Sequence, residues 1–353
     1  MLNIESISKS FGKFELKPVQ LKIESGEYFI LLGASGSGKT VLLEIIAGLI
    51  HPDTGTISID GQEITNIKIQ NRKIGLVFQD HAIFPHLSVY DNIAYPLKST
   101  GAKKSEIKLT VEELAGEMNI LPLLRRKAIN LSGGEKQRIA LARVLAMNPK
   151  CLLLDEPFAS LDVQLKSELR TLLRQINGRG ISILHVTHDY EEALSLADKV
   201  AVINDGQLLQ SGTPEEVFRY PKNRFVANFV GVKNFFRADL LDFIDKSEER
   251  LARVSDTLSF TLISNQSSGN GYVFLRSKSV ILSEDSMKSS ASNSFQGKVI
   301  QIEKTPKGYE VLLDIGVKIF VTITERSYHR LSVAVDRLLW VSFKASALRF
   351  QKT

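Results

Sequence analysis

The sequence predicts an α/β nucleotide-binding fold followed by a smaller all-β barrel. Three observations lead to this prediction. A glycine-rich loop stands between an apolar strand-like run and a helix-like run, strand-like and helix-like segments alternate through residues 1–230, and residues 231–353 are mainly strand-like. Such alternation is typical of a mainly parallel sheet, whereas a series of short strands is typical of a small barrel. We therefore expect two domains, 1–230 and 231–353.

The glycine-rich loop has the spacing G-x-x-x-x-G-K-T, between the apolar run Tyr28–Leu32 and the helical run Val41–Ala47. Its residues are Gly33, Ala34, Ser35, Gly36, Ser37, Gly38, Lys39 and Thr40. Glycines let the backbone fold around phosphate oxygens, and the helix that follows adds the positive end of its dipole. Lys39 is suited to reach the β- and γ-phosphates, and the Thr40 hydroxyl to hold Mg²⁺. The loop therefore predicts an ATP site that works with Mg²⁺.

A second motif is the apolar run 152–154 followed by Asp155 and Glu156. Asp155 is placed to hold Mg²⁺, usually through water, and Glu156 to polarise an attacking water as general base. The alternative is a solvated strand end that happens to carry two acids. Because the phosphate loop is present, we favour the catalytic interpretation.

A third motif is Leu-Ser-Gly-Gly-Glu at residues 131–135. Ser132 and Glu135 have capping-box spacing, which predicts a helix that continues to Met147. Gly133 and Gly134 are poor helix formers, and they make sense where a backbone must approach an anion. The alternative is a helix that is simply well capped.

The remaining helices and strands are predicted from the periodicity of hydrophobic residues and from turn residues. The expected strands of the first domain are Leu2–Ser8, Val19–Ile23, Thr56–Ile59, Ile74–Phe78, Leu152–Leu154, Ser182–Val186, Val200–Ile203 and Gln207–Gln210. Turns are expected at Asp60-Gly61 and Asp205-Gly206. Helices are expected over Leu97–Leu124 and Val163–Ile176, and from a capping box at Thr213 and Glu216. The second domain is expected to have strands Tyr272–Leu275, Gly297–Glu303, Tyr309–Ile315, Lys318–Ile323 and Leu338–Phe343, with a loop over Ser283–Ser294.

Composition narrows the class of protein. Hydrophobic content of 43% and charged content of 24% are ordinary for a globular protein of 353 residues. No apolar run is long enough to span a membrane, the N-terminal residues lack the order of a signal peptide, and the single Cys151 excludes an internal disulfide and fits a reducing cytosol. Residues 231–353 carry 18 Lys+Arg against 13 Asp+Glu, most of the net charge of +6. This surplus suits an anion, a nucleic acid or a membrane surface, but it is also common without any such partner.

The three motifs, in this order, resemble the ATP-binding subunit of ABC transporters over essentially all of residues 1–230. The resemblance implies an ABC cassette, with a RecA-like core, an antiparallel β subdomain and a helical subdomain. It implies an ATPase that couples hydrolysis of ATP to ADP and phosphate with transport.

The resemblance also assigns residues. It implies that Phe11 stacks on adenine, although tyrosine is more usual there, and that Gln79 senses Mg²⁺ and the partner subunit. It implies that Asp162 lies in the loop that links two cassettes and that His188 contacts the γ-phosphate. The implied catalytic residues are Lys39, Gln79, Glu156 and His188. The implied Mg²⁺ ligands are Thr40, Gln79 and Asp155. The implied ATP contacts are Phe11, residues 33–40, Ser132, Gly133, Gly134 and Asp162.

Partners follow from the same resemblance. Two copies are expected to pair head to tail, with each ATP between the phosphate loop of one copy and Ser132 and Gly134 of the other. Two membrane-spanning permease subunits are expected to contact Gln79 and residues 80–85. Ile83 and Phe84 would grip a partner helix there or, alternatively, pack within the helical subdomain. An extracytoplasmic substrate-binding protein completes the system, and the expected location is peripheral, on the cytoplasmic face of the cell membrane.

The second domain resembles the molybdate-binding (TOBE or Mop-like) barrel, an OB-like fold, on molybdate and tungstate importer ATPases. The similarity is carried by residues 290–299, 323–331 and 343–346, and related barrels occur on sulfate, polyamine, iron and sugar importers. The candidate oxyanion donors are Ser290, Asn293, Lys344 and Ser346. One departure is Ser292, where the family often has arginine, so a strong anion partner is missing. The alternative is a scaffold without ligand. If the barrel binds the anion, feedback inhibition of uptake is expected.

Other classes fit less well. ABC proteins that act on DNA or ribosomes usually have tandem cassettes or long coiled coils, and this chain has neither, so no nucleic acid is expected. An anion-binding regulator with an inactive cassette is disfavoured because Lys39, Gln79, Asp155, Glu156 and His188 are all present. Exporters usually fuse the cassette to membrane helices. We therefore expect an importer ATPase for molybdate or tungstate, with sulfate, polyamine, iron or sugar import as the alternative.

Overall fold

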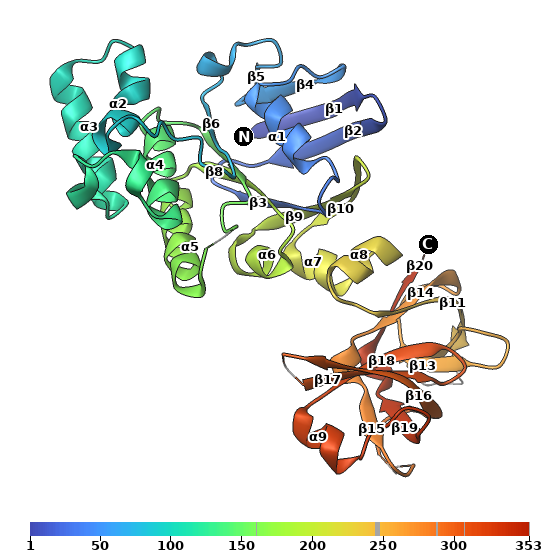
Figure 1. The fold of residues 1–353 in the computed structure, drawn as a ribbon. Helices are drawn as coiled ribbons and strands as arrows, with labels where there is room; N and C mark the ends of the chain where they lie inside the picture. The colour runs from blue at the N-terminus through green and yellow to red at the C-terminus, as the bar shows by residue number, and fades with distance from the viewer. Residues whose placement is uncertain (160, 244–247, 287–288, 307, 353) are drawn as a thin grey trace. The chain divides into compact units, whose positions relative to one another are not determined.

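The computed structural model describes residues 1–159, 161–243, 248–286, 289–306 and 308–352. The chain divides into two compact units, Met1–Val217 and Phe218–Thr353, each with its own sheets (Figure 1). No helix among the described residues is long and apolar enough to cross a membrane.

A six-stranded sheet, ordered β10-β9-β3-β8-β7-β6, forms the centre of the first unit. Its strands are β3 (Tyr28–Leu32), β6 (Ile74–Val77), β7 (Cys151–Asp155), β8 (Ser182–Thr187), β9 (Lys199–Asn204) and β10 (Gln207–Gly212). All neighbours are parallel except β9 and β10. Every residue of β3, β7 and β8 is buried, which explains their continuous apolar runs. Because these three strands are parallel, the phosphate loop, Glu156 and His188 all follow the same edge of the sheet.

A four-stranded antiparallel sheet, ordered β2-β1-β4-β5, lies against the same core. Its strands are β1 (Leu2–Phe11), β2 (Phe14–Ile23), β4 (Thr54–Ile59) and β5 (Gln62–Glu63). The expected start of β2 at Val19 was wrong, because the strand begins at Phe14. Pro18 does not end it, since β2 is an edge strand, where proline is tolerated.

The helices of the first unit are α1 (Lys39–Ala47), α2 (Val89–Ser99), α3 (Lys104–Glu117), α4 (Gly133–Leu145), α5 (Val163–Asn177) and α6 (Tyr190–Leu196), with α7 (Pro214–Arg219) at its boundary. Helices α2, α3 and α4 contact one another and form the helical group in Figure 1. The single helical stretch expected over Leu97–Leu124 was wrong. Ser88 starts α2 earlier by accepting a hydrogen bond from the Asp91 N–H, and Gly101 at φ 74° interrupts the chain before α3.

Several local predictions are confirmed. In the capping box of α4, the Ser132 N–H donates to Glu135 Oε2 at 2.7 Å and the Glu135 N–H donates to Ser132 Oγ at 3.3 Å. Thr213 and Glu216 form the same reciprocal pair ahead of α7. The turns at Asp60-Gly61 and Asp205-Gly206 have positive φ at both residues, as the tight hairpin turn requires.

The second unit contains α8 (Arg224–Phe229), α9 (Glu325–Arg330) and two five-stranded antiparallel sheets around one shared core. One sheet is β13 (Ser259–Ile263), β12 (Glu249–Arg253), β11 (Asn234–Phe243), β14 (Gly269–Leu275) and β20 (Leu348–Lys352). The other is β15 (Ile281–Ser283), β19 (Leu338–Phe343), β16 (Asn293–Thr305), β17 (Gly308–Asp314) and β18 (Lys318–Ile323). This confirms an all-β barrel domain, with twice the number of strands expected.

Strands β11, β12, β13, β15 and β20 were not predicted. In β12 and β20, two basic residues stand three positions apart (Arg250 and Arg253, and Arg349 and Lys352), which obscures the alternation of a strand. The serine-rich loop is confirmed over 284–286 and 289–292, whereas both predicted ends were wrong, because Ser283 belongs to β15 and Asn293 and Ser294 to β16; residues 287–288 lie outside the described residues.

Candidate nucleotide site

The phosphate loop connects the buried end of β3 to the start of α1. Gly36 and Gly38 adopt φ of 78° and 101°, a left-handed region that residues with a side chain rarely occupy. Gly33 has a different constraint, because a Cβ there would lie 2.4 Å from the carbonyl oxygen of Ile203 on β9. The loop therefore needs glycine for backbone conformation at two positions and for close packing at a third.

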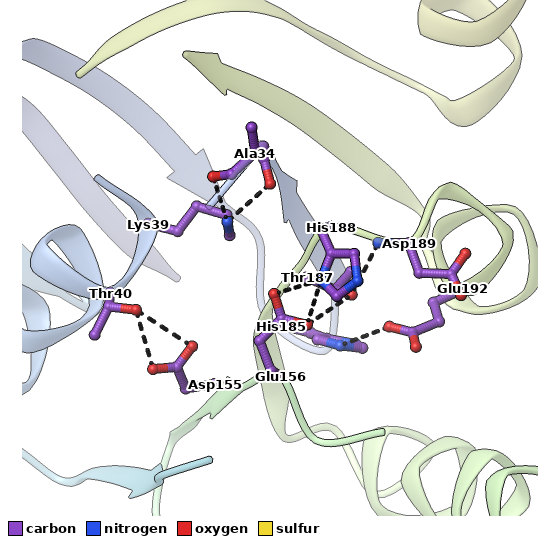
Figure 2. A network of polar contacts seen from close by, with 11 residues as sticks. Ala34, Lys39, Thr40, Asp155, Glu156, His185, Thr187, His188, Asp189 and Glu192 are labelled. Carbon is purple, nitrogen blue, oxygen red and sulfur yellow. Dashed lines mark hydrogen bonds and ion pairs between the residues drawn. The ribbon is translucent and has the colours of Figure 1, made fainter. Parts of the chain in front are cut away.

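Lys39 is folded back onto this loop. Its Nζ donates to the carbonyl oxygens of Gly33 and Ala34, at 2.8 and 2.9 Å (Figure 2). Burial lowers the pKa of Lys39, and the carboxylates of Glu156 and Asp155 oppose that shift. The Ser37 hydroxyl is buried without a hydrogen-bond partner. A phosphate in the loop would supply an acceptor for both the Lys39 ammonium and the Ser37 hydroxyl, so the residues present fit a nucleoside triphosphate.

Thr40 and Asp155, the two residues predicted to hold Mg²⁺ together with Gln79, meet beside the loop. The Thr40 hydroxyl donates to Asp155 Oδ2 at 3.2 Å. Burial raises the pKa of Asp155, and the hydroxyl of Thr40 opposes this. Gln79 lines a cavity of about 500 Å³ together with Asp155. Hydroxyl, carboxylate and carboxamide oxygens suit Mg²⁺, which usually takes its remaining ligands from water and from substrate phosphates.

Glu156 and His188 form a second pair at the same edge of the sheet. His188 Nδ1 lies 2.9 and 3.0 Å from the two carboxylate oxygens of Glu156 (Figure 2). Glu156 has a φ of 46°, and its N–H donates to the Val186 carbonyl at 2.9 Å, which ties β7 to β8 at this point. The resemblance implied that His188 contacts the γ-phosphate; in this structure its partner is the general-base candidate.

Thr187 was not singled out from the sequence. Its hydroxyl accepts from the Asp189 N–H at 3.1 Å and donates to Glu156 Oε2 at 3.4 Å. Its only sequence signal was its place between Val186 and His188 at the end of an apolar strand.

Two aromatic residues flank the phosphate loop. Phe11 ends β1, is 42% exposed and lies under Lys9, whose Nζ is 5.6 Å from the ring centroid. Phe14, which the sequence analysis missed, lines a cavity of about 170 Å³ with Gly36, Gly38 and Lys39 among others. A Cβ at Gly38 would lie 2.7 Å from the Phe14 ring. Phe14 therefore walls the loop from outside, while Phe11 remains available to stack on a base.

The Leu-Ser-Gly-Gly motif and Asp162 occupy the starts of two neighbouring helices. Ser132 caps α4, and Asp162 caps α5 by accepting from the Leu165 N–H at 2.9 Å. Gly134 is buried against the Leu165 side chain, whereas Gly133 faces open space. Among the described residues, no hydrogen bond joins this group to the phosphate loop of the same chain.

The four oxyanion candidates lie around one end of the β16–β19 pair, where Asn293 is opposite Phe343. Ser290, Lys344 and Ser346 are exposed. The Asn293 side chain is buried, and both its oxygen and its nitrogen hydrogen-bond the main chain of Thr261 at 2.8 Å. Asn293 therefore ties β16 to β13, and Ser292 bonds Glu249 at 2.8 Å.

Known proteins show clear similarity to both units. The ABC transporter family matches residues 16–159 and the TOBE domain family residues 289–350. A molybdate/tungstate import ATP-binding protein of Pyrococcus abyssi is 42% identical over 352 residues, 99% of each chain. A sulfate/thiosulfate import ATP-binding protein of Bacillus cereus is 46% identical over 241 residues, 67% of this chain and 68% of its own. A solved dimer of the ATP-binding cassette MJ0796, in a post-hydrolysis state with ADP and Pi, has a TM-score of 0.56 at 29% identity, covering 61% of this chain and 99% of that one.

Proposed function

Because this chain belongs to the ABC transporter family of ATP-binding import proteins, we propose that it powers the uptake of molybdate or tungstate. One observation carries the choice of substrate. The similarity to the molybdate/tungstate relative extends over 352 residues and includes the barrel, whereas that to the sulfate relative covers 241 residues. Since the cassette hydrolyses ATP for every substrate, the barrel is the part that distinguishes them. Import of sulfate, polyamine, iron or sugar is the alternative.

The ATPase chemistry uses the residues at the edge of the central sheet. The loop N–H groups and Lys39 would bind the phosphates, and Thr40, Asp155 and Gln79 would hold Mg²⁺, which when bound neutralises phosphate charge. Glu156 would accept the proton of the attacking water, and His188 Nδ1 orients the carboxylate that does so.

Pairing of two copies would complete each site. Ser132 and Gly133 are exposed, and Gly133 has open space beside it for an approaching phosphate. The dimeric state of the similar cassette supports a dimer here. ATP between two copies would then join the phosphate loop of one copy to Ser132 and Gly134 of the other.

An apolar groove of about 410 Å³ is the proposed seat of a helix from each permease subunit. Phe84 lines it, with its ring tilted against that of Tyr95 at a centroid distance of 4.6 Å, and Arg143 lies over the Phe84 ring at 5.2 Å. Ile83 is half-buried outside the groove lining. The exposed apolar rim formed by Leu49 and Tyr95, among others, fits an amphipathic partner helix. This contact would hold the chain peripherally on the cytoplasmic face of the membrane.

Replacement of Tyr95 by Asp is expected to abolish co-purification of co-expressed permease subunits, because a charge would enter the apolar rim. ATP affinity should stay unchanged. Leu109→Asp is the matched control, since Leu109 is an exposed apolar residue on α3 that does not line the groove. Retention of the permease by Tyr95→Asp would rule out this groove.

The barrel is proposed to bind the transported anion and thereby to restrain uptake when it accumulates. Ser290, Lys344 and Ser346 would supply donors at the surface, and the buried amide of Asn293 would fix the strand between them. Such feedback requires that the anion bind the resting state more tightly than the ATP-bound dimer.

Calorimetric titration of the full chain tests this site. Molybdate and tungstate are expected to bind at least about tenfold more tightly than sulfate, and Lys344→Ala to weaken them by roughly tenfold or more, since a charge-assisted hydrogen bond is lost. Lys318→Ala removes the same charge from β18 of the same barrel and should leave the affinity unchanged. Absence of any binding would make the barrel a scaffold and leave the ATPase function intact.

A further inference from the structure

A buried polar cluster lies beneath the hydrolytic residues and takes no part in the chemistry described so far. Tyr28 on β3, His185 on β8 and Glu192 on α6 form it, and their exposed fractions are 1%, 0% and 5%. A buried carboxylate is costly unless it is paired, so its presence requires an explanation.

The cluster forms a chain of contacts. The Tyr28 hydroxyl lies 3.2 Å from His185 Nδ1, and His185 Nε2 lies 3.4 Å from Glu192 Oε2. Burial, followed by the charge of Glu192, raises the pKa of Tyr28 well above 10, so the phenol keeps its proton. When the imidazole is neutral, Tyr28 donates to Nδ1 and the ring proton is on Nε2. When the imidazole is charged, both ring nitrogens carry a proton. Either way, an N–H faces Glu192.

Glu192 stays ionised in this setting. Burial alone would raise its pKa, but the facing His185 ring, the Thr187 hydroxyl and the nearby charge of Lys166 together lower it. Further charges acting on the cluster come from Arg170 and Arg174 of α5 and from Asp155, which interacts with His185.

Two contacts connect the cluster to the hydrolytic pair. The Thr187 hydroxyl donates to Glu156 Oε2 at 3.4 Å (Figure 2), and the same hydroxyl lowers the pKa of Glu192. The Phe158 ring, two residues after Glu156, packs on the His185 ring with centroids 5.6 Å apart. The segment that carries Glu156 and the strand end that carries His188 therefore both rest on this cluster.

We propose that Glu192 is a positioning residue that orients Glu156 and His188 through His185 and Thr187. The inference rests on the proposed hydrolytic roles of that pair. The ionised carboxylate anchors His185 and draws on the Thr187 hydroxyl, and this holds the end of β8 at a fixed distance from Glu156. The orientation of the base matters for the hydrolytic step but not for binding of ATP. Loss of Glu192 is therefore expected to lower kcat and to leave KM unchanged.

Steady-state ATP hydrolysis by the full chain provides the first test. Glu192→Gln and Thr187→Val, both close in shape to the native residue, are each expected to lower kcat by roughly tenfold with KM for ATP unchanged. Thr187→Ser keeps the hydroxyl and should recover most of the rate lost in Thr187→Val. The double variant should be no slower than the slower single variant, because both changes break one pathway.

Ser182→Ala is the matched control. Ser182 is a buried hydroxyl at the opposite end of β8, bonded to the Glu24 carbonyl at 3.0 Å. If its kcat falls as far as that of Glu192→Gln, general loosening of the strand explains the result and the positioning role is overturned. If the fall in kcat of the double variant equals the product of the falls in Glu192→Gln and Thr187→Val, the two residues act independently and the positioning role is also overturned.

Histidine side-chain ¹⁵N NMR tests the inference without turnover. The His188 resonances are expected to shift in Glu192→Gln and in Thr187→Val, and to stay unchanged in Ser182→Ala. Unchanged His188 resonances in the first two variants would contradict the inference. A wild-type chain without ATPase activity would instead count against the proposed function, and the NMR comparison would still decide this point.

Discussion

Replacement of Glu156 by Gln is expected to reduce ATP hydrolysis by roughly 10²- to 10⁴-fold. The amide keeps the size of the side chain and its place beside His188, but it has no basic oxygen to take the proton from water. Binding of ATP should persist, because the proposed phosphate ligands are Lys39 and the loop rather than Glu156. Phosphate release in single-turnover conditions measures the chemical step directly.

The same variant should accumulate as an ATP-bound dimer. With hydrolysis blocked, ATP would remain between the phosphate loop of one copy and Ser132 and Gly134 of the other, and light scattering with size exclusion would report a doubled mass. Glu191→Gln, an exposed acid on α6, is the control and should behave as the wild-type protein. A variant that stays monomeric in excess ATP would contradict the head-to-tail dimer, and one that still hydrolyses ATP would remove Glu156 from its role.

Replacement of Lys39 by Met is expected to weaken ATP binding by roughly 100-fold. Methionine preserves the aliphatic bulk of a side chain that is 7% exposed, but it removes the ammonium group. Loss of a hydrogen bond to a charged group costs about 1.5–3 kcal/mol, which corresponds to about 10- to 150-fold in affinity. The nearby carboxylates of Asp155 and Glu156 would also repel the phosphates once their cation is gone.

Titration with a fluorescent ATP analogue measures this effect. Lys108→Met is the control, because Lys108 is an exposed lysine on α3. Equal affinities of Lys39→Met and the wild-type protein would show that the loop backbone alone binds the phosphates. The amount of folded protein should be checked by circular dichroism, so that loss of binding is not confused with loss of fold.

The comparison of sequence with structure shows which features were predictable. The phosphate loop, the capping boxes at Ser132 and Thr213 and the glycine turns each depend on residues within a few positions of one another. The sequence therefore determined them, together with the family and the two kinds of domain. The strands β12 and β20 were missed because their basic residues hide an alternation that only the barrel core makes visible.

The tertiary structure decided which distant residues meet. Phe14 reaches Gly38 because β2 passes the phosphate loop, and His188 contacts Glu156 because β7 and β8 are neighbours in the sheet. Asn293 was a candidate anion donor by its motif, yet in the folded barrel its side-chain amide hydrogen-bonds the main chain of Thr261. Glu192 is one of several acids near the end of an apolar strand, and only the packing of α6 on the sheet buries it beside His185. Local motifs depend on backbone dihedrals and short-range hydrogen bonds. The contacts between distant residues depend instead on strand order and on burial, which many residues far apart in the sequence determine together.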